Sequence, residues 1–336
     1  MIHSFIKRRT FLMLFSFFFV FLHSTMAHCT PSRPLVIKIF SSNNKYGFQL
    51  DREILKEQLE KLGHTVIEKE FNDHSYESSD INIFVHKVLK KQIGTAQINW
   101  FMPNPECFTQ KAGSLVGINL ILCRTHLAEE IFQKMEQPTY YLGFTSQDLH
   151  SDTIEKDYSQ YLHVAGRSPY KGTNEVIQTW NKDPTLTNLT IVDQRNKSVL
   201  TNPNVNWIKR WIPFDQLYQL KNSCGFHLCP STAEGYGHYI VEAMSAGVVI
   251  ITTDAPPMNE FITDPRCLVP YSSTAPCGAD IRHYVTPEDL RKTIDSLKQL
   301  SIAELQEIGE HNRTIYFEKQ LEFYQNLELL MDTVDL

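Results

Sequence analysis

Two glutamates eight positions apart flank a glycine-rich turn in this 336-residue chain. Glu234 precedes Gly235 and Gly237, and Glu242 lies in the apolar stretch that ends at Gly247. This pattern predicts a helix that begins between the two acids, about one turn before Glu242. A helix N-terminus presents unpaired N–H groups and suits a phosphate, so the flanking acids would suit sugar hydroxyl groups. The alternative interpretation is a plain glycine-rich turn followed by an amphipathic helix with surface acids.

Two cations form a second candidate element upstream. Arg167 and Lys171 lie between a predicted strand and a helix led by Thr173, which we expect to cap that helix. Arginine grips phosphate oxygens as a fork and lysine acts as a point charge. Together they would offset a diphosphate and stabilise the charge that builds on it as it leaves. Exposed cations without a ligand are the alternative interpretation.

These two blocks together resemble the signature of retaining nucleotide-sugar glycosyltransferases of the GT-B fold, family four, also called glycosyl transferases group 1. The family pattern is Glu-Gly-(Phe/Tyr)-Gly, a second Glu after seven intervening residues, and then Ala-Met-Ala-x-Gly. Residues 234–250 match it almost throughout, and residues 166–172 match the family's Gly-Arg…Lys-Gly element. The resemblance is strong over residues 162–262 and weak elsewhere.

The resemblance implies roles for individual residues. Arg167 and Lys171 would hold the donor pyrophosphate, Glu242 the ribose hydroxyls, and Glu234 the hydroxyls of the transferred sugar. The expected catalytic residues are Glu234, Arg167 and Lys171, and the expected donor site comprises Arg167, Lys171, Glu234, Gly235, Tyr236, Gly237, His238 and Glu242. The implied co-substrate is a UDP-sugar or GDP-sugar, and no cofactor or metal is expected. Retention in the family is pictured as front-face attack, with the leaving phosphate assisting deprotonation of the acceptor.

Three features depart from the family pattern. Arg167 and Lys171 are four residues apart where the family usually has five. The pair Pro256-Pro257 replaces a Gly-Gly pair, and proline has no N–H to offer a phosphate. Glu260, three residues on, still matches the family's acid. Residues 43–47 replace the usual glycine-rich first loop.

Composition and element order predict the architecture. With 42% apolar and 21% charged residues, the chain is typical of globular proteins, and its net charge of −6 gives no reason to expect a nucleic acid partner. Strand and helix patterns alternate, which indicates α/β domains with parallel sheets. We therefore expect a GT-B fold: two Rossmann-like domains facing a cleft, with a C-terminal helix crossing back to the first. The boundaries are an acceptor-side domain at 34–150, a donor domain at 158–312, and the helix at 313–332.

Candidates for the acceptor side are fewer. In the string 100–106, two prolines would set Asn104 and Glu106 at a strand end facing the cleft. His86 follows an apolar strand, and Gly47 is the single glycine of the first loop. A structural turn and a buried histidine are the alternative interpretations. The acceptor is expected to be a hydroxyl group of a glycan, a lipid-linked compound or a protein glycan.

The N-terminus has the order of a targeting segment. Three cations at 7–9 precede an apolar run at 11–22 and small residues up to Ala27. This order predicts a secretory signal peptide at 1–27, or an uncleaved anchor associated with a membrane. The protein would then be in the secretory pathway, extracytoplasmic or membrane-anchored. Two other functions remain open: a secreted two-lobed sugar- or solute-binding protein, and a nucleotide-sugar epimerase or inactive relative.

Overall fold

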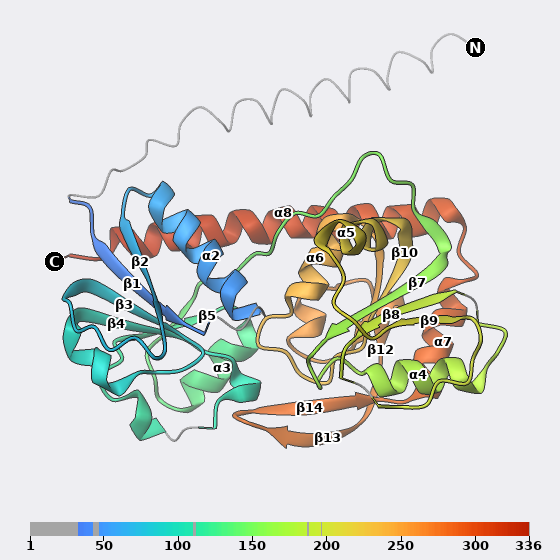
Figure 1. Cartoon of the computed structure of the whole chain (residues 1–336), viewed down its shortest axis with the longest axis horizontal. Helices are drawn as coiled ribbons and strands as arrows, with labels where there is room; N and C mark the ends of the chain where they lie inside the picture. The colour runs from blue at the N-terminus through green and yellow to red at the C-terminus, as the bar shows by residue number, and fades with distance from the viewer. Residues whose placement is uncertain (1–32, 43–46, 110–111, 187, 196, 336) are drawn as a thin grey trace, which may run out of the picture.

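The computed structural model describes residues 33–42, 47–109, 112–186, 188–195 and 197–335. The predicted signal or anchor segment at 1–27 lies outside these residues. The chain forms two α/β units side by side, bridged by one long helix (Figure 1). The predicted α/β class with two parallel sheets is confirmed.

The first unit contains a six-stranded parallel sheet in the order β2-β1-β3-β4-β5-β6. Its strands are β1 (Val36–Ser41), β2 (Thr65–Glu70), β3 (Ser79–Val85), β4 (Ala96–Met102), β5 (Leu120–Cys123) and β6 (Thr139–Tyr141). Its helices are α2 (Gly47–Lys61), α3 (His126–Lys134) and the short 3-10 helices η1 (Lys90–Thr95), η2 (Pro105–Cys107) and η3 (Ala112–Leu115). The central strands β1 and β3 are mostly buried apolar runs, as expected for parallel strands covered on both faces.

The second unit repeats this plan with the strand order β12-β11-β10-β7-β8-β9. Its strands are β7 (Asp157–Gly166), β8 (Leu189–Asp193), β9 (Val205–Ile208), β10 (Cys224–Cys229), β11 (Val249–Thr253) and β12 (Leu268–Val269). Its helices are α4 (Thr173–Lys182), α5 (Phe214–Ser223), α6 (His238–Ala246), α7 (Pro287–Leu297), η4 (Met258–Glu260) and η5 (Pro265–Cys267). Every residue of β8, β10 and β11 is buried, so this sheet forms the centre of its unit.

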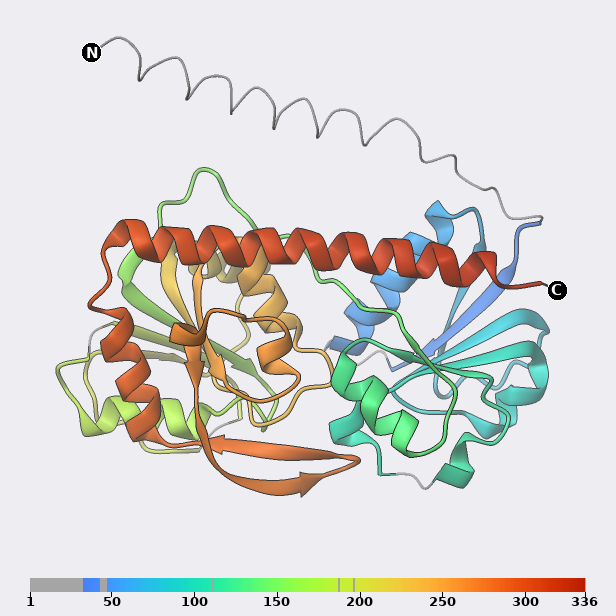
Figure 2. The same ribbon diagram turned by 180° about the vertical axis from the view of Figure 1, so that it is seen from behind.

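Helix α8 (Ile302–Asp332) runs along both units (Figure 2). It begins at a capping box in which the Ser301 and Glu304 side chains bond each other's backbone N–H groups. The sequence pattern suggested separate segments and a boundary at 313, but the helix passes through this position without a break. Near its start Gly309 lies against the end of α6, where a Cβ would be 2.3 Å from the Gly247 carbonyl oxygen.

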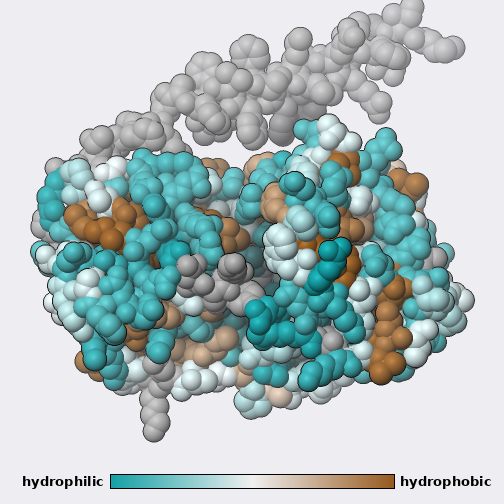
Figure 3. Space-filling view, in the orientation of Figure 1, coloured by the Kyte–Doolittle hydropathy of each residue, from teal (hydrophilic) through white to brown (hydrophobic). Residues whose placement is uncertain are grey.

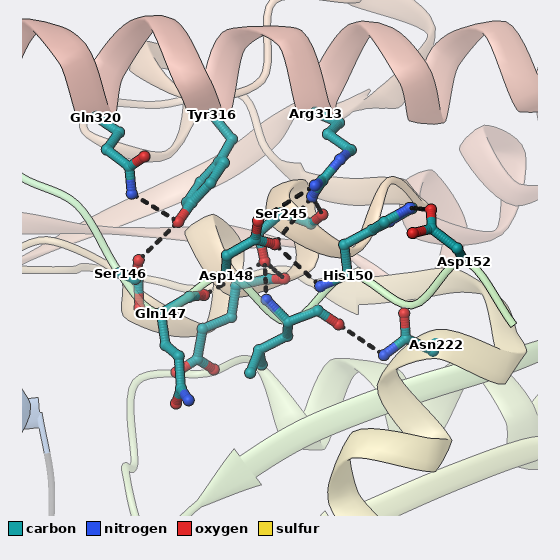
Figure 4. A network of polar contacts seen from close by, with 12 residues as sticks. Ser146, Gln147, Asp148, His150, Asp152, Asn222, Ser245, Arg313, Tyr316 and Gln320 are labelled. Atoms are coloured by element: carbon teal, nitrogen blue, oxygen red, sulfur yellow. Dashed lines mark hydrogen bonds and ion pairs between the residues drawn. The ribbon is translucent and has the colours of Figure 1, made fainter. Parts of the chain in front are cut away.

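The segment that crosses between the units is tied to α8 (Figure 4). The Tyr316 hydroxyl donates to the Ser146 carbonyl oxygen (2.9 Å), and Arg313 pairs with Asp148 (2.9 Å). The backbone N–H of Leu149 donates to the Ser245 hydroxyl in α6 at 2.9 Å. These contacts therefore hold the crossing segment against α8 and α6.

A two-stranded antiparallel hairpin also connects the units. It comprises β13 (Tyr271–Cys277) and β14 (Asp280–Val285), and it extends from the second unit toward the near edge of the first (Figure 1). At its tip the Ala279 N–H donates to the Pro105 carbonyl oxygen at 2.9 Å. Sequence analysis assigned no element to this segment.

Hydrophilic residues cover much of the face shown in Figure 3, and hydrophobic ones form separate patches. Within the described ranges, no helix has both the length and the apolar character needed to cross a membrane.

Candidate functional site

A cavity of about 670 Å³ lies between the two units. Its walls come from the start of α2 and the loops after β4, β5, β7 and β10, which are carboxyl ends of parallel strands. Such ends are the usual ligand position in open α/β sheets. The ends of α2 and α6 meet at this cavity (Figure 1), where a Cβ on Gly47 would be 3.3 Å from the His238 ring.

The predicted cations lie in the loop between β7 and α4, and both line the cavity. The Lys171 ammonium donates to Glu234 Oε1 at 2.6 Å and lies 3.7 Å from the centroid of the Tyr239 ring. The prediction that Thr173 caps α4 is wrong. Gly172 is the N-cap at φ 68°, and the Thr173 hydroxyl instead bonds His163 Nε2 at 2.9 Å, because that histidine is buried beside it.

The predicted helix start between the two acids is confirmed, since α6 begins at His238 after a left-handed Gly237. Glu234 is buried in the preceding loop and bonds the Ser231 hydroxyl as well as Lys171. Glu242 lies in the second turn of α6 and pairs with Lys221 of α5. Both acids line the cavity, and each has a lysine as its partner.

The structure places Tyr236 and His238 at the contact between the units. The Tyr236 ring is buried and its hydroxyl donates to the Phe144 carbonyl oxygen at 2.7 Å, so this side chain contributes to the packing between the two units. His238 bonds Asp51 Oδ1 through Nε2 (2.8 Å) and the Ser146 hydroxyl through Nδ1 (3.0 Å).

Sequence analysis missed the buried pair of Asp51 and Arg124 in the first unit. The Arg124 guanidinium donates to Asp51 Oδ1 at 2.7 Å and to the Pro103 carbonyl oxygen at 3.2 Å. Burial alone would raise the pKa of Asp51, but the Arg124 charge and the contact with His238 hold it below its usual value. One signal was available, because Arg124 directly follows an apolar strand at its carboxyl end.

The acceptor-side candidates separate into two groups. Gly47, Asn104 and Glu106 line the cavity. His86 does not belong to its walls: its ring stacks behind Phe48 at 4.2 Å, and burial lowers its pKa to about 4. The prediction that His86 belongs to the acceptor side of the site is therefore corrected, because the Phe48 side chain of α2 covers the His86 ring.

Glu260, which matched the family's acid, does not line the cavity. Its carboxylate accepts the backbone N–H groups of His126 (2.8 Å) and Leu127 (2.9 Å). These are the first residues of α3, so an acid of the second unit caps a helix of the first. The contact satisfies unpaired N–H groups and complements the helix dipole.

Fold and cavity together define a two-domain protein of the GT-B class, with the cleft between its Rossmann-like domains. The family model described as "Glycosyl transferases group 1" matches residues 146–315, and the chain belongs to this family. No curated protein sequence matches it.

Several solved structures are similar in fold. HepE from Anabaena, in complex with UDP, has a TM-score of 0.64 at 12% identity, covering 89% of this chain and 100% of HepE. The pneumococcal O-GlcNAc transferase GtfA, with UDP and GlcNAc, has a TM-score of 0.56 at 17% identity, covering 75% of this chain and 56% of GtfA. This chain thus spans little more than half of GtfA. An E. coli trehalose-6-phosphate structure bound to UDP-2-fluoro glucose has a TM-score of 0.57 at 8% identity, covering 76% and 73% of the two chains.

Proposed function

We propose that this protein is a retaining glycosyltransferase that moves a sugar from a nucleoside-diphosphate sugar, UDP- or GDP-linked, to a hydroxyl acceptor. The acceptor would be a glycan, a lipid-linked compound or a protein glycan. One observation carries the proposal: Arg167, Lys171, Glu234 and Glu242 line a single interdomain cavity at the start of α6. The UDP bound in HepE and in GtfA supports the donor class.

The four side chains would contact different parts of the donor. Arg167 and Lys171 would hold the diphosphate and stabilise its growing charge as the bond to the anomeric carbon breaks. Lys171 would turn from Glu234 toward the phosphate, and Glu234 would then accept hydrogen bonds from sugar hydroxyls. Glu242 would do the same for the ribose. Among the residues that the structure describes, no group of three His, Cys, Asp or Glu side chains is placed to hold a metal ion.

A thermal-shift panel on the full chain tests this proposal, with UDP, GDP, ADP and their common sugar conjugates. A ligand at a hundred times its dissociation constant should add about 2.7 kcal/mol to the free energy of unfolding. We expect stabilisation by one diphosphate, lost in Arg167→Ala and Glu242→Ala and retained in Glu307→Ala, which changes an exposed residue of α8. Stabilisation by free sugars without any response to nucleotides would favour the two-lobed binding protein instead.

We also propose, on the sequence of residues 1–27, that the protein enters the secretory pathway or is held at a membrane. Fractionation of expressing cells with an antibody to the second domain tests this. Recovery in the cytosolic fraction at full length would refute it.

A further inference from the structure

One side of helix α5 forms a wall of the cavity. The residues of this helix that line the cavity are Phe214, Leu217, Tyr218 and Lys221. They follow the spacing i, i+3, i+4, i+7, which places them on one side of the helix. Three of them are aromatic or aliphatic, and Lys221, in the last turn, carries the charge. The wall therefore changes from apolar to charged toward the end of α5, where it contacts α6.

The charged end of this wall holds one oxygen of Glu242. Lys221 is only 4% exposed, and its ammonium group donates to Glu242 Oε2. The other carboxylate oxygen, Oε1, accepts no hydrogen bond from the residues that the structure describes, and it is not fully buried. Both side chains line the cavity. One oxygen of Glu242 is thus bound by the lysine, and the other is accessible to a ligand.

The backbone around Lys221 is held by contacts that involve no ligand. Its carbonyl oxygen accepts a hydrogen bond from Nε2 of the buried His227 at 3.0 Å. Burial and the Lys221 charge lower the pKa of His227 to about 3, so this ring is neutral near pH 7. The next residue, Asn222, donates from its side-chain amide to the Leu149 carbonyl oxygen at 2.7 Å (Figure 4). The lysine is therefore fixed in place, as a residue that orients another should be.

A buried ion pair of this kind adds little to stability on balance, because desolvation of the two charges offsets their attraction. What Lys221 supplies is orientation, since a carboxylate with one oxygen bound presents the other in one direction. A hydroxyl group, which donates a hydrogen bond, suits that oxygen. The lysine also offsets the negative charge of Glu242, which would otherwise repel a diphosphate in the same cavity.

We propose that Lys221 is a positioning residue that orients Glu242 toward the ribose of the donor, so that the site prefers nucleotides with ribose hydroxyl groups. This inference rests on the proposed function, in which Glu242 binds the ribose. Lys171 would turn from Glu234 to the phosphate, but Lys221 keeps its carboxylate when the donor binds. Lys221 itself contacts neither the ribose nor the diphosphate.

The test compares UDP with 2′,3′-dideoxy-UDP, which lacks both ribose hydroxyl groups. GDP and its dideoxy analogue replace them if the thermal-shift panel selects guanosine. Calorimetry on the full chain, with nucleotide in large excess so that weak binding is also recorded, gives the ratio of the two dissociation constants. Because hydrogen bonds to charged groups are strong, the wild type should bind the ribonucleotide at least about tenfold more tightly. Lys221→Met, which keeps the side-chain length and removes the charge, should reduce this ratio below about threefold.

A second substitution shows whether Lys221 acts through Glu242. In Glu242→Ala the ratio should be close to one, and the addition of Lys221→Met should not change it further. Lys221→Gln, with the same expected fall in the ratio, replaces Lys221→Met if circular dichroism shows that the latter is unfolded. Lys182→Met is the matched control: Lys182 of α4 pairs with Glu288 of α7 in the same domain but does not line the cavity, so the ratio should stay at the wild-type value.

A wild-type ratio in the Lys221 variant would overturn the inference. An equal loss of affinity for both nucleotides would also overturn it, because Lys221 would then act on the diphosphate or on the fold. The same holds if the wild type binds UDP and its dideoxy analogue equally, since Glu242 would then not hold the ribose; the glycosyltransferase proposal would survive this result. A wild-type chain that binds no nucleotide would refute the proposed function itself, and the inference with it.

Discussion

The buried carboxyl group of Glu106 should make the protein less stable as the pH rises. In the folded chain the pKa of Glu106 is about 7, against an ordinary value of 4.5. A raised pKa means that folding favours the protonated acid, so the penalty for burying the charge is absent below pH 4.5 and complete above pH 7. At about 1.4 kcal/mol for each pKa unit, the penalty at pH 8 is about 3 kcal/mol.

Glu106→Gln removes this penalty, because the amide has nearly the same shape and carries no charge. We expect the variant and the wild type to have similar free energies of unfolding at pH 5, and the variant to be more stable by up to about 3 kcal/mol at pH 8. Urea unfolding at a series of pH values, followed by tryptophan fluorescence and circular dichroism, measures the difference. Exchange of the exposed Glu307 for Gln is the control and should leave the pH dependence unchanged.

The result that refutes this reasoning is a difference between variant and wild type that does not grow with pH. A lower stability of Glu106→Gln at pH 8 would have the same consequence, since it would mean that the ionised acid stabilises the fold. Confirmation would mean that a cavity residue is retained at a cost in stability, which is common at functional sites.

Three further substitutions test the contacts between the domains. Asp51→Asn leaves Arg124 buried without its charge partner, so the free energy of unfolding in urea should fall by roughly 3 kcal/mol or more, whereas Asp152→Asn, at an exposed acid, should change little. Glu260→Ala removes the acceptor of the first two N–H groups of α3, although the N-cap Thr125 remains, and should cost about 1 kcal/mol, with Glu260→Gln intermediate; equal stability of all three proteins would show that the contact is unimportant. Gly235→Ala places a Cβ 2.4 Å from Asn104 Nδ2, so the turn or the facing loop must move; hydrolysis of the nucleotide sugar should slow by about 100-fold, the melting temperature should fall, and a wild-type rate would contradict the close approach.

The local pattern of the sequence predicted those parts of the molecule that depend on neighbours along the chain. The alternation of strands and helices is such a pattern, and so is the start of α6 between Glu234 and Glu242. The loop with Arg167 and Lys171 follows the carboxyl end of β7, and this position brought it to the cavity. In each case a short stretch of sequence determines both the element and its end.

Contacts between residues far apart along the chain were not predictable in this way. The pair of Asp51 and Arg124 joins positions 73 residues apart, and the place of Arg124 at the end of a strand does not show which residue of another element it contacts. Glu260 was recognised from a family pattern, yet its contact with α3 depends on how the two domains face each other. His86 failed as a candidate because Phe48, from another element, covers it. The hairpin of β13 and β14 lacks strong alternation, since most of its residues are exposed or half-buried.

Helix α8 makes the first domain discontinuous along the chain. Residues 302–332 begin beside α6 and end against the first sheet, where the Tyr140 hydroxyl donates to the Asn326 carbonyl oxygen at 2.8 Å and Phe323 packs on Phe144 at 4.8 Å. A fragment that stopped at residue 150 would expose the apolar surface that Phe323 and Leu327 now cover. Chimaeras that exchange acceptor specificity with a relative would therefore need two crossover points. One would lie in the segment before β7, and the other within α8, so that the end of this helix travels with the domain it completes.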